Sequence, residues 1–239
     1  MTVDVVVHPS EPVLAAAIAS RLIVSLSDAL SSRGTASVVL TGGGIGTACL
    51  AAVTSNPARD AVDWSRVDFW WGDERFVPSG DPERNETGAR DALLDHIPAD
   101  PARVHVMAAS DGAYGDDVDA AAAAYAAEVP SSFDVVMLGI GPEGHVASLF
   151  PWAPALGDDR PAVAVRNSPK PPPTRISLTF GPLRSASEVW ILASGASKAD
   201  AIAAVVSGAS PSGCPAAGAT GRNRTLLLVD REAAAKLPA

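Results

Sequence analysis

The sequence predicts an α/β protein with a mostly parallel, doubly wound sheet and helices on both faces. Short runs rich in Val, Ile and Leu alternate along the chain with longer, often alanine-rich segments, and this alternation is typical of parallel sheets. Glycines directly follow several of the apolar runs. With 239 residues, 47% of them hydrophobic, the chain can bury a sizeable core. We therefore expect a single domain over residues 1–239, with room for a small added lobe.

The first half of the chain begins with a valine-rich strand at residues 2–8. Ser10 can cap a helix with Glu11 and Pro12 in its first turn, and that helix stops near Gly34. Strands follow at 37–40 and 67–71, and helices at 47–53, 86–96 and 116–129. By composition the charged run at 72–75 could be a solvated loop, but its position at the carboxyl end of a buried strand favours a site instead.

The second half is built around the apolar run 133–138, which we expect to be the central strand. Further strands are predicted at 175–179, 188–193 and 225–230, a helix at 195–206 and a short helix at the C-terminal end. The proline-rich segment 157–174 predicts an extended loop able to cover a site, and the Gly/Ala/Ser/Pro-rich segment 207–221 predicts a mobile loop.

One histidine, His145, follows the glycine-rich turn Gly139–Gly144 after the central strand. Sites in open α/β sheets form outside the carboxyl ends of the strands. Isolated histidines are often only structural, although histidine titrates near neutral pH. The turn has the spacing Gly-x-Gly-x-x-Gly, but Pro142 lies inside it and a proline-rich segment follows, so a dinucleotide site is disfavoured.

A second glycine-rich turn, Gly42-Gly43-Gly44, lies between a predicted strand and a predicted helix. Backbone N–H groups and the helix dipole favour an anion there, and glycine lets a phosphate approach closely. A flexible turn is the plainer alternative. The pattern predicts a phosphate site.

The string GIGPEGHVASLFP at residues 139–151 resembles the signature of the 6-phosphogluconolactonases, which are grouped with the glucosamine-6-phosphate deaminases and isomerases. Further matches follow the family's order and span nearly the whole chain: LTGGGIG at 40–46, WWGDERFVP at 70–78, Asn85, RISLT at 175–179 and Gly-Ala-Ser-Lys at 195–198. The family usually has Asp where this chain has Glu143. It usually has Ser-Thr-Pro at 44–46, and Thr41 and Thr47 are the candidates here for the missing hydroxyl donors.

The resemblance implies hydrolysis of 6-phospho-D-glucono-1,5-lactone to 6-phosphogluconate in the oxidative pentose phosphate pathway. His145 would take a proton from water and return it to the ring oxygen, with Glu143 orienting the imidazole. Arg75, or backbone N–H groups of the 139–144 turn, would stabilise the oxyanion.

Asp73 is implied as a further catalytic residue and is the next base to test. Arg175, Lys198 and the Gly42–Gly44 turn would hold the phosphate. The resemblance implies no cofactor and no metal.

Two other functions stay open. A deaminase needs a carboxylate where this chain has Phe150, and a phenyl ring cannot transfer protons, so that reaction is disfavoured. A non-catalytic sugar-phosphate sensor usually carries a DNA-binding segment, and a net charge of −9 argues against a nucleic-acid partner.

No membrane partner is expected, because no apolar run of about 20 residues and no signal peptide are evident. The two cysteines, Cys49 and Cys214, make no metal pattern with the four histidines. A reduced, cytoplasmic protein is the simplest interpretation.

Overall fold

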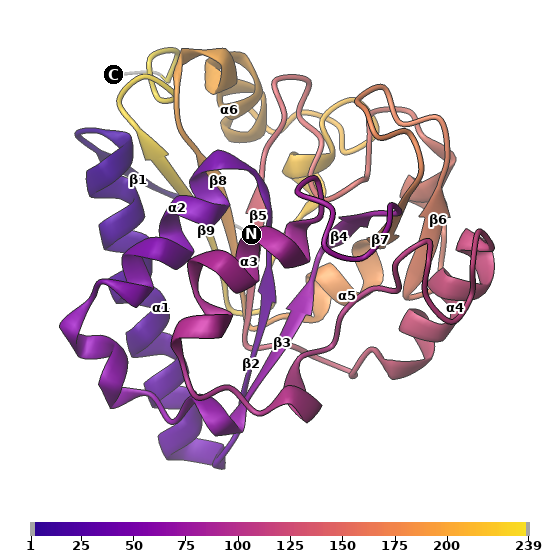
Figure 1. The fold of residues 1–239 in the computed structure, drawn as a ribbon. Coiled ribbons are helices and arrows are strands. Elements are labelled where there is room, and N and C mark those ends of the chain that lie inside the picture. The colour runs from indigo at the N-terminus through magenta and orange to yellow at the C-terminus, as the bar shows by residue number, and fades with distance from the viewer. Residues whose placement is uncertain (1–2, 238–239) are drawn as a thin grey trace.

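A computed structural model describes residues 3–237 and shows a six-stranded sheet in the order β1-β9-β8-β5-β2-β3, with every neighbouring pair parallel (Figure 1). Its strands are β1 (Val3–His8), β2 (Ala36–Leu40), β3 (Val67–Trp71), β5 (Val135–Gly139), β8 (Glu188–Ala193) and β9 (Arg224–Asp230). The predicted parallel sheet is confirmed. Thr2, the expected start of the first strand, lies outside the described residues.

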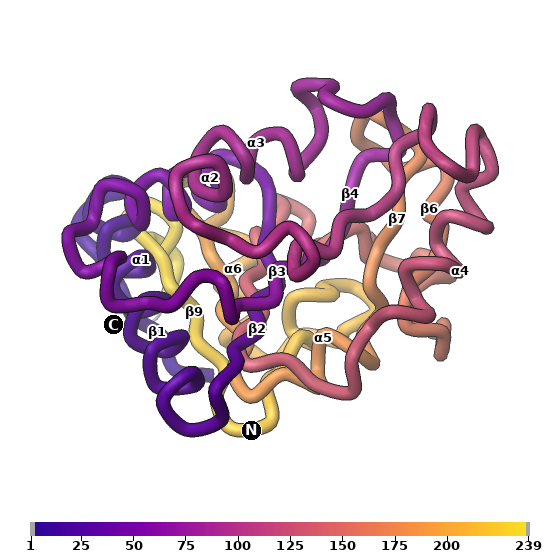
Figure 2. The backbone as a smooth tube through the Cα atoms, turned by 60° about the horizontal axis from the view of Figure 1, so that its bottom comes forward, coloured from indigo at the N-terminus to yellow at the C-terminus, as the bar shows by residue number. Residues whose placement is uncertain are grey.

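A second, antiparallel sheet has the order β4-β7-β6 and consists of β4 (Asp73–Arg75), β7 (Arg175–Leu178) and β6 (Ala162–Val165). It lies with α4 on the side of the main sheet away from α1, and this arrangement is visible in both views (Figures 1 and 2). The charged run at 72–75, for which a site was favoured over a solvated loop, contributes β4, and two of its residues line a cavity described below. The prediction of an extended loop at 157–174 was wrong for residues 162–165, which form β6. Both strands form by pairing with β7. Residues 162–165 pair with nearby residues 175–178, whereas β4 pairs with a strand about 100 residues further along the chain, and no local sequence pattern predicts that second pairing.

Helices pack around the main sheet. They are α1 (Glu11–Arg33), α2 (Gly43–Thr54), α3 (Asn85–Ala92), α4 (Val118–Glu128), α5 (Phe180–Ser185) and α6 (Ala199–Val206). Short 3-10 turns occupy Pro57–Ala61, Trp64–Arg66, Leu94–His96, Pro101–Arg103, Pro154–Gly157, Ala196–Lys198 and Pro215–Gly218. Helix α2 begins four residues earlier than expected, because the glycine-rich turn itself forms its first turn. The predicted C-terminal helix is instead a series of turns over residues 231–236.

Helix α1 ends as predicted, with Gly34 in the left-handed conformation and donating to the Leu30 carbonyl, whereas Ser10 makes no side-chain capping bond. By length and composition α1 is apolar enough to cross a membrane. Eight of its residues are nevertheless buried, spaced as one face of a helix, and the helix packs on α2, β2 and β9. This packing is that of a core helix.

The core centres on β5, β8 and β9, whose side chains are buried on both faces of the sheet, as expected for parallel strands. The segment after α6, predicted as a mobile loop, has its second half packed into this core. Cys214, Ala216 and Ala219 are buried, and the Ala216 N–H donates to the Gly144 carbonyl. This half of the segment therefore supports the turn that carries His145.

Candidate active site

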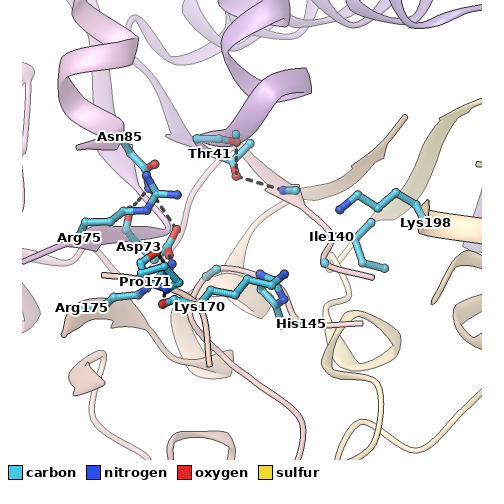
Figure 3. Close-up of a pocket in the computed structure, with 15 residues that line it drawn as sticks. Thr41, Asp73, Arg75, Asn85, Ile140, His145, Lys170, Pro171, Arg175 and Lys198 are labelled. Carbon is cyan, nitrogen blue, oxygen red and sulfur yellow. Dashed lines mark hydrogen bonds and ion pairs between the residues drawn. The ribbon is translucent and has the colours of Figure 1, made fainter. Parts of the chain in front are cut away.

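A cavity of about 230 Å³ opens at the carboxyl ends of the main-sheet strands, next to the second sheet. It brings together seven of the nine residues predicted for the site: Gly42, Gly43, Asp73, Arg75, His145, Arg175 and Lys198. Figure 3 shows Arg75, Arg175 and Asp73 on one side of this cavity and Lys198 on the other, with His145 and Lys170 between them. Glu143 contacts His145 but does not line the cavity, and Gly44 lines an adjoining cavity.

The imidazole of His145 is held on two sides. Its Nδ1 atom lies 3.0 Å from Oε1 of Glu143, although Nδ1 makes no hydrogen bond of normal geometry, so the contact is chiefly electrostatic. The ring packs on Phe150 with centroids 4.6 Å apart, and only 14% of the side chain is exposed. Burial, assisted by the Lys170 charge, lowers the pKa of His145 against the opposing effect of Glu143 and Asp73. The neutral form, which can accept a proton, is favoured.

Two glycines make room for this arrangement. A Cβ at Gly141 would lie 1.9 Å from Nδ1 of His145. Gly144 has φ +87°, and a Cβ there would lie 2.6 Å from Sγ of Cys214. Side chains at these positions are therefore incompatible with the turn.

The carboxylate of Glu143 lies between the His145 imidazole and the Lys170 ammonium. While Oε1 faces His145, Oε2 accepts a hydrogen bond from Nζ of Lys170 at 3.1 Å. Partial burial opposes ionisation, yet the residue's own backbone N–H, His145 and Lys170 together lower the pKa of Glu143. Sequence reasoning missed Lys170. The chain has only three lysines, and this rarity was the signal available in the sequence. Two of the three, Lys170 and Lys198, line the cavity.

Asp73 is tied into a buried polar network. Its Oδ2 accepts a hydrogen bond from the Ser148 hydroxyl at 2.6 Å, and Asn85 donates to the Asp73 carbonyl at 2.8 Å. Oδ2 also lies 3.6 Å from Nη1 of Arg175. Through these contacts the Asp73 carboxylate on β4 is connected to Ser148, just after the His145 turn, and to Arg175 on β7.

Arg175 is only 4% exposed and has most of its donors engaged. Nε donates to the Pro172 carbonyl, and Nη2 donates to the carbonyls of Lys170 and Pro171. Nη1 has only longer contacts, 3.5 Å to the Ser148 hydroxyl and 3.6 Å to Asp73. The guanidinium thus anchors the proline-rich loop through Nε and Nη2, while Nη1 can still donate to a ligand in the cavity.

Two cations keep unused donors. Arg75 donates from Nη1 to the Glu83 carbonyl, and its buried Nε has no hydrogen-bond partner in the described part of the chain. Within residues 3–237 the Lys198 ammonium makes no ion pair or side-chain hydrogen bond. Burial, with Lys170 nearby, lowers the pKa of Lys198. Both cations are available to an anionic ligand.

The glycine-rich turn presents the N-terminus of α2 to the site. Gly42 is the N-cap, and Gly42 and Gly43 line both this cavity and the adjoining one of about 170 Å³, which Lys198 also lines. The Thr41 hydroxyl reaches the cavity while accepting from the Gly139 N–H at 3.0 Å. Thr47, the other candidate hydroxyl, lines neither cavity.

No group of three or more His, Cys, Asp or Glu side chains within residues 3–237 is arranged to hold a metal ion. The donors that face the cavity are instead mainly cationic, and cations repel metal ions while attracting phosphate and carboxylate groups.

The fold and the cavity define an α/β protein with an anion-binding site built around one buried imidazole. Comparison with known proteins identifies the family: residues 9–228 match the model described as glucosamine-6-phosphate isomerases/6-phosphogluconolactonase, and the chain belongs to this family. It is 57% identical to 6-phosphogluconolactonase of Streptomyces coelicolor, over 99% of this chain and 95% of the relative. It is 49% identical to 6-phosphogluconolactonase of Mycobacterium tuberculosis, over the full length of both.

The fold is also that of a solved 6-phosphogluconolactonase from Thermotoga maritima, with a TM-score of 0.84 and 23% identity over 96% of this chain and all of that one.

Proposed function

We propose that this chain is a carboxylic ester hydrolase that converts 6-phospho-D-glucono-1,5-lactone into 6-phosphogluconate in the oxidative pentose phosphate pathway. The observation that carries the proposal is one buried imidazole, favoured in its neutral form, beside a cavity lined by Arg75, Lys170, Arg175 and Lys198. The family membership and the 57% identity to a 6-phosphogluconolactonase support the same reaction.

His145 is the general base. Because Nδ1 faces Glu143, Nε2 is the nitrogen left for water, and neutral imidazole accepts the water proton as hydroxide adds to the lactone carbonyl. The imidazolium so formed is stabilised by the Glu143 carboxylate beside it. It then returns the proton to the ring oxygen as the C–O bond breaks and the carboxylic acid product forms.

Arg75 stabilises the oxyanion. Of the two sources considered from the sequence, the backbone N–H groups of the 139–144 turn are largely engaged. Gly139 donates to Thr41, Gly141 to the His145 carbonyl, and Gly144 to the Gly141 carbonyl. Within residues 3–237 the only side-chain hydrogen bond of Arg75 is from Nη1 to the Glu83 carbonyl, so Nη2 of this cavity-lining side chain is free to donate.

The phosphate is held by Lys198, the N-terminus of α2 and Nη1 of Arg175. Lys198 contributes an ammonium with no partner in the described chain, and Gly42 and Gly43 let a phosphate approach the helix N-terminus closely. Gly44 lines only the adjoining cavity, so it can contact the phosphate only if the phosphate reaches into that cavity. A chain with net charge −9 meets its anionic substrate through this local positive charge.

Asp73 supports the site rather than acting as the base. Its Oδ2 is already engaged by Ser148 and Arg175, and the residue is 7% exposed.

Glucosamine-6-phosphate deamination is disfavoured, because Phe150 packs on His145 at the position where that reaction needs a carboxylate. The reaction as written requires no cofactor or metal. A cytoplasmic location fits the two unpaired, buried cysteines.

A coupled assay with freshly generated 6-phosphogluconolactone tests the proposal, with the spontaneous hydrolysis of the lactone subtracted. Glucosamine 6-phosphate serves as the competing substrate. Turnover of the lactone alone supports the proposal. Turnover of the amino sugar, or binding of 6-phosphogluconate without lactone turnover, would refute it.

A further inference from the structure

The Lys170 ammonium is placed by a tightly constrained loop. The side chain runs from the proline-rich loop toward His145 (Figure 3). Carbonyls of three consecutive residues, 170 to 172, accept from the buried Arg175, and the Ser168 hydroxyl bonds both the carbonyl and the N–H of Lys170. The Ser168 N–H closes the loop on the Pro173 carbonyl at 2.9 Å. Four prolines in residues 169–173 further restrict the backbone. The position of Lys170 is therefore built into the fold.

The contact that Lys170 makes is with Glu143, and it decides which way that carboxylate faces. Lys170 holds Oε2 at 3.1 Å, while Oε1 lies 3.0 Å from Nδ1 of His145. Glu143 is 34% exposed and sits on a turn, so without a second anchor its side chain has other rotamers available in solvent. The ion pair removes that freedom.

We propose that Lys170 is a positioning residue for the reaction, which acts by fixing the Glu143 carboxylate against Nδ1 of His145. The role rests on the proposed function, because it matters only if His145 is the base. It differs from phosphate binding, since the ammonium is already engaged by Glu143 at 3.1 Å, whereas Lys198 has no such partner within residues 3–237.

The charged groups around His145 set the expected pH effects. They are Glu143 on its own turn, Asp73 on β4, Lys170 on the proline-rich loop and, further away, Lys198 and Arg175 across the cavity. Removing the Lys170 cation raises the pKa of His145, and removing the Glu143 anion lowers it. Glu143→Gln should therefore move the acidic limb of kcat/KM to lower pH. Lys170→Met should move it to higher pH, and by more in the Glu143→Gln background than in the wild type, where release of the Glu143 carboxylate offsets part of the rise.

A double-mutant cycle on Lys170→Met and Glu143→Gln tests the proposal, with kcat measured on the alkaline plateau where His145 is neutral in every variant. The free energy of a partly exposed ion pair corresponds to a factor of roughly two to five in an equilibrium or a rate constant. Lys170→Met should therefore lower kcat by about that factor. In the Glu143→Gln background the same change should have almost no effect on kcat, because the carboxylate it positions is gone. Lys170→Arg should restore most of the rate.

Lys236→Met is the matched control, because Lys236 also pairs with a carboxylate, Asp200 at 2.6 Å, but lies outside the cavity. Its kcat should equal that of the wild type. An equal loss of kcat from Lys170→Met in both backgrounds would overturn the proposal, as would a rise in KM with kcat unchanged, since either result places Lys170 on the substrate.

Titration of the His145 ring by NMR, without substrate, separates this proposal from the proposed function. The imidazole signal is assigned by its loss in His145→Asn. A His145 pKa that rises more on Lys170→Met in the Glu143→Gln background than in the wild type supports the positioning role whether or not the protein is a lactonase, because only in the wild type does release of the Glu143 carboxylate offset the rise. If Lys170→Met left both the His145 pKa and kcat unchanged, the proposal would be wrong and Lys170 would be an ordinary surface charge.

Discussion

Replacing His145 by Asn tests the chemical step directly. Asparagine keeps a polar side chain of similar reach but has no nitrogen that accepts a proton near neutral pH, and no other histidine lines the cavity. We expect kcat to fall by roughly 10²–10⁴, the usual contribution of a positioned acid–base group. That loss corresponds to about 3–5 kcal/mol of transition-state stabilisation.

The structure also sets the direction of the pH dependence. Burial lowers the pKa of His145, so the acidic limb of kcat/KM should lie below the ordinary histidine value, and activity should fall as pH drops through it. The variant should lose this limb, because asparagine does not titrate. The assay is the background-corrected lactone assay across the pH range, with binding of 6-phosphogluconate measured by calorimetry.

His96→Asn is the control, since His96 contacts only the Asp91 carbonyl on the surface and should keep full activity. If His145→Asn retained near-wild-type activity with an unchanged pH profile, the general-base argument would be refuted. The chemistry would then have to lie elsewhere, and Asp73 would be the next base to test.

Three further predictions concern the cations and the glycine turn. Lys198→Met should raise KM for the phosphorylated lactone roughly tenfold or more while hardly affecting unphosphorylated gluconolactone, because charged hydrogen bonds are worth about 1.5–3 kcal/mol; equal losses on both substrates would contradict a phosphate role. Arg175→Ala should in addition lower the melting temperature, as three loop carbonyls lose their donor. Gly144→Ala should destabilise the fold by about 1–3 kcal/mol in urea unfolding, since φ is +87° and Cys214 leaves no room; an unchanged midpoint would contradict this.

The parallel sheet could be predicted because each strand is a local apolar run bounded by turn residues. The strand at 188–193 has the same bounds in the structure, and the helix ending near Gly34 stops where its glycine takes the left-handed conformation. The start of α2 could not be placed, because glycines signal a turn by composition, yet here Gly43 and Gly44 form the first helical turn.

The site was predictable where its residues directly follow main-sheet strands, as His145 and the Gly42–Gly43 turn do. Of the second sheet only β7 was predicted, because β4 depends on pairing with β7 far along the chain. Lys170 was missed for the same reason. Its loop is shaped by carbonyl bonds to an arginine that lies on β7, and a proline-rich sequence alone gives no direction to the side chain it carries.

The junction of the two sheets explains how a chain of net charge −9 concentrates positive charge in one cavity. Arg75 and Arg175 are paired across β4 and β7, so the antiparallel register itself brings two arginines to the same edge of the cavity. Lys198 arrives from the opposite wall, on the 3-10 turn after β8. Two of these cations are partly neutralised by carboxylates: Arg175 by the buried Asp73, and Lys170 by the partly exposed Glu143. The cavity can therefore attract a phosphorylated substrate, while the Lys170 charge and burial favour the neutral imidazole that the reaction uses.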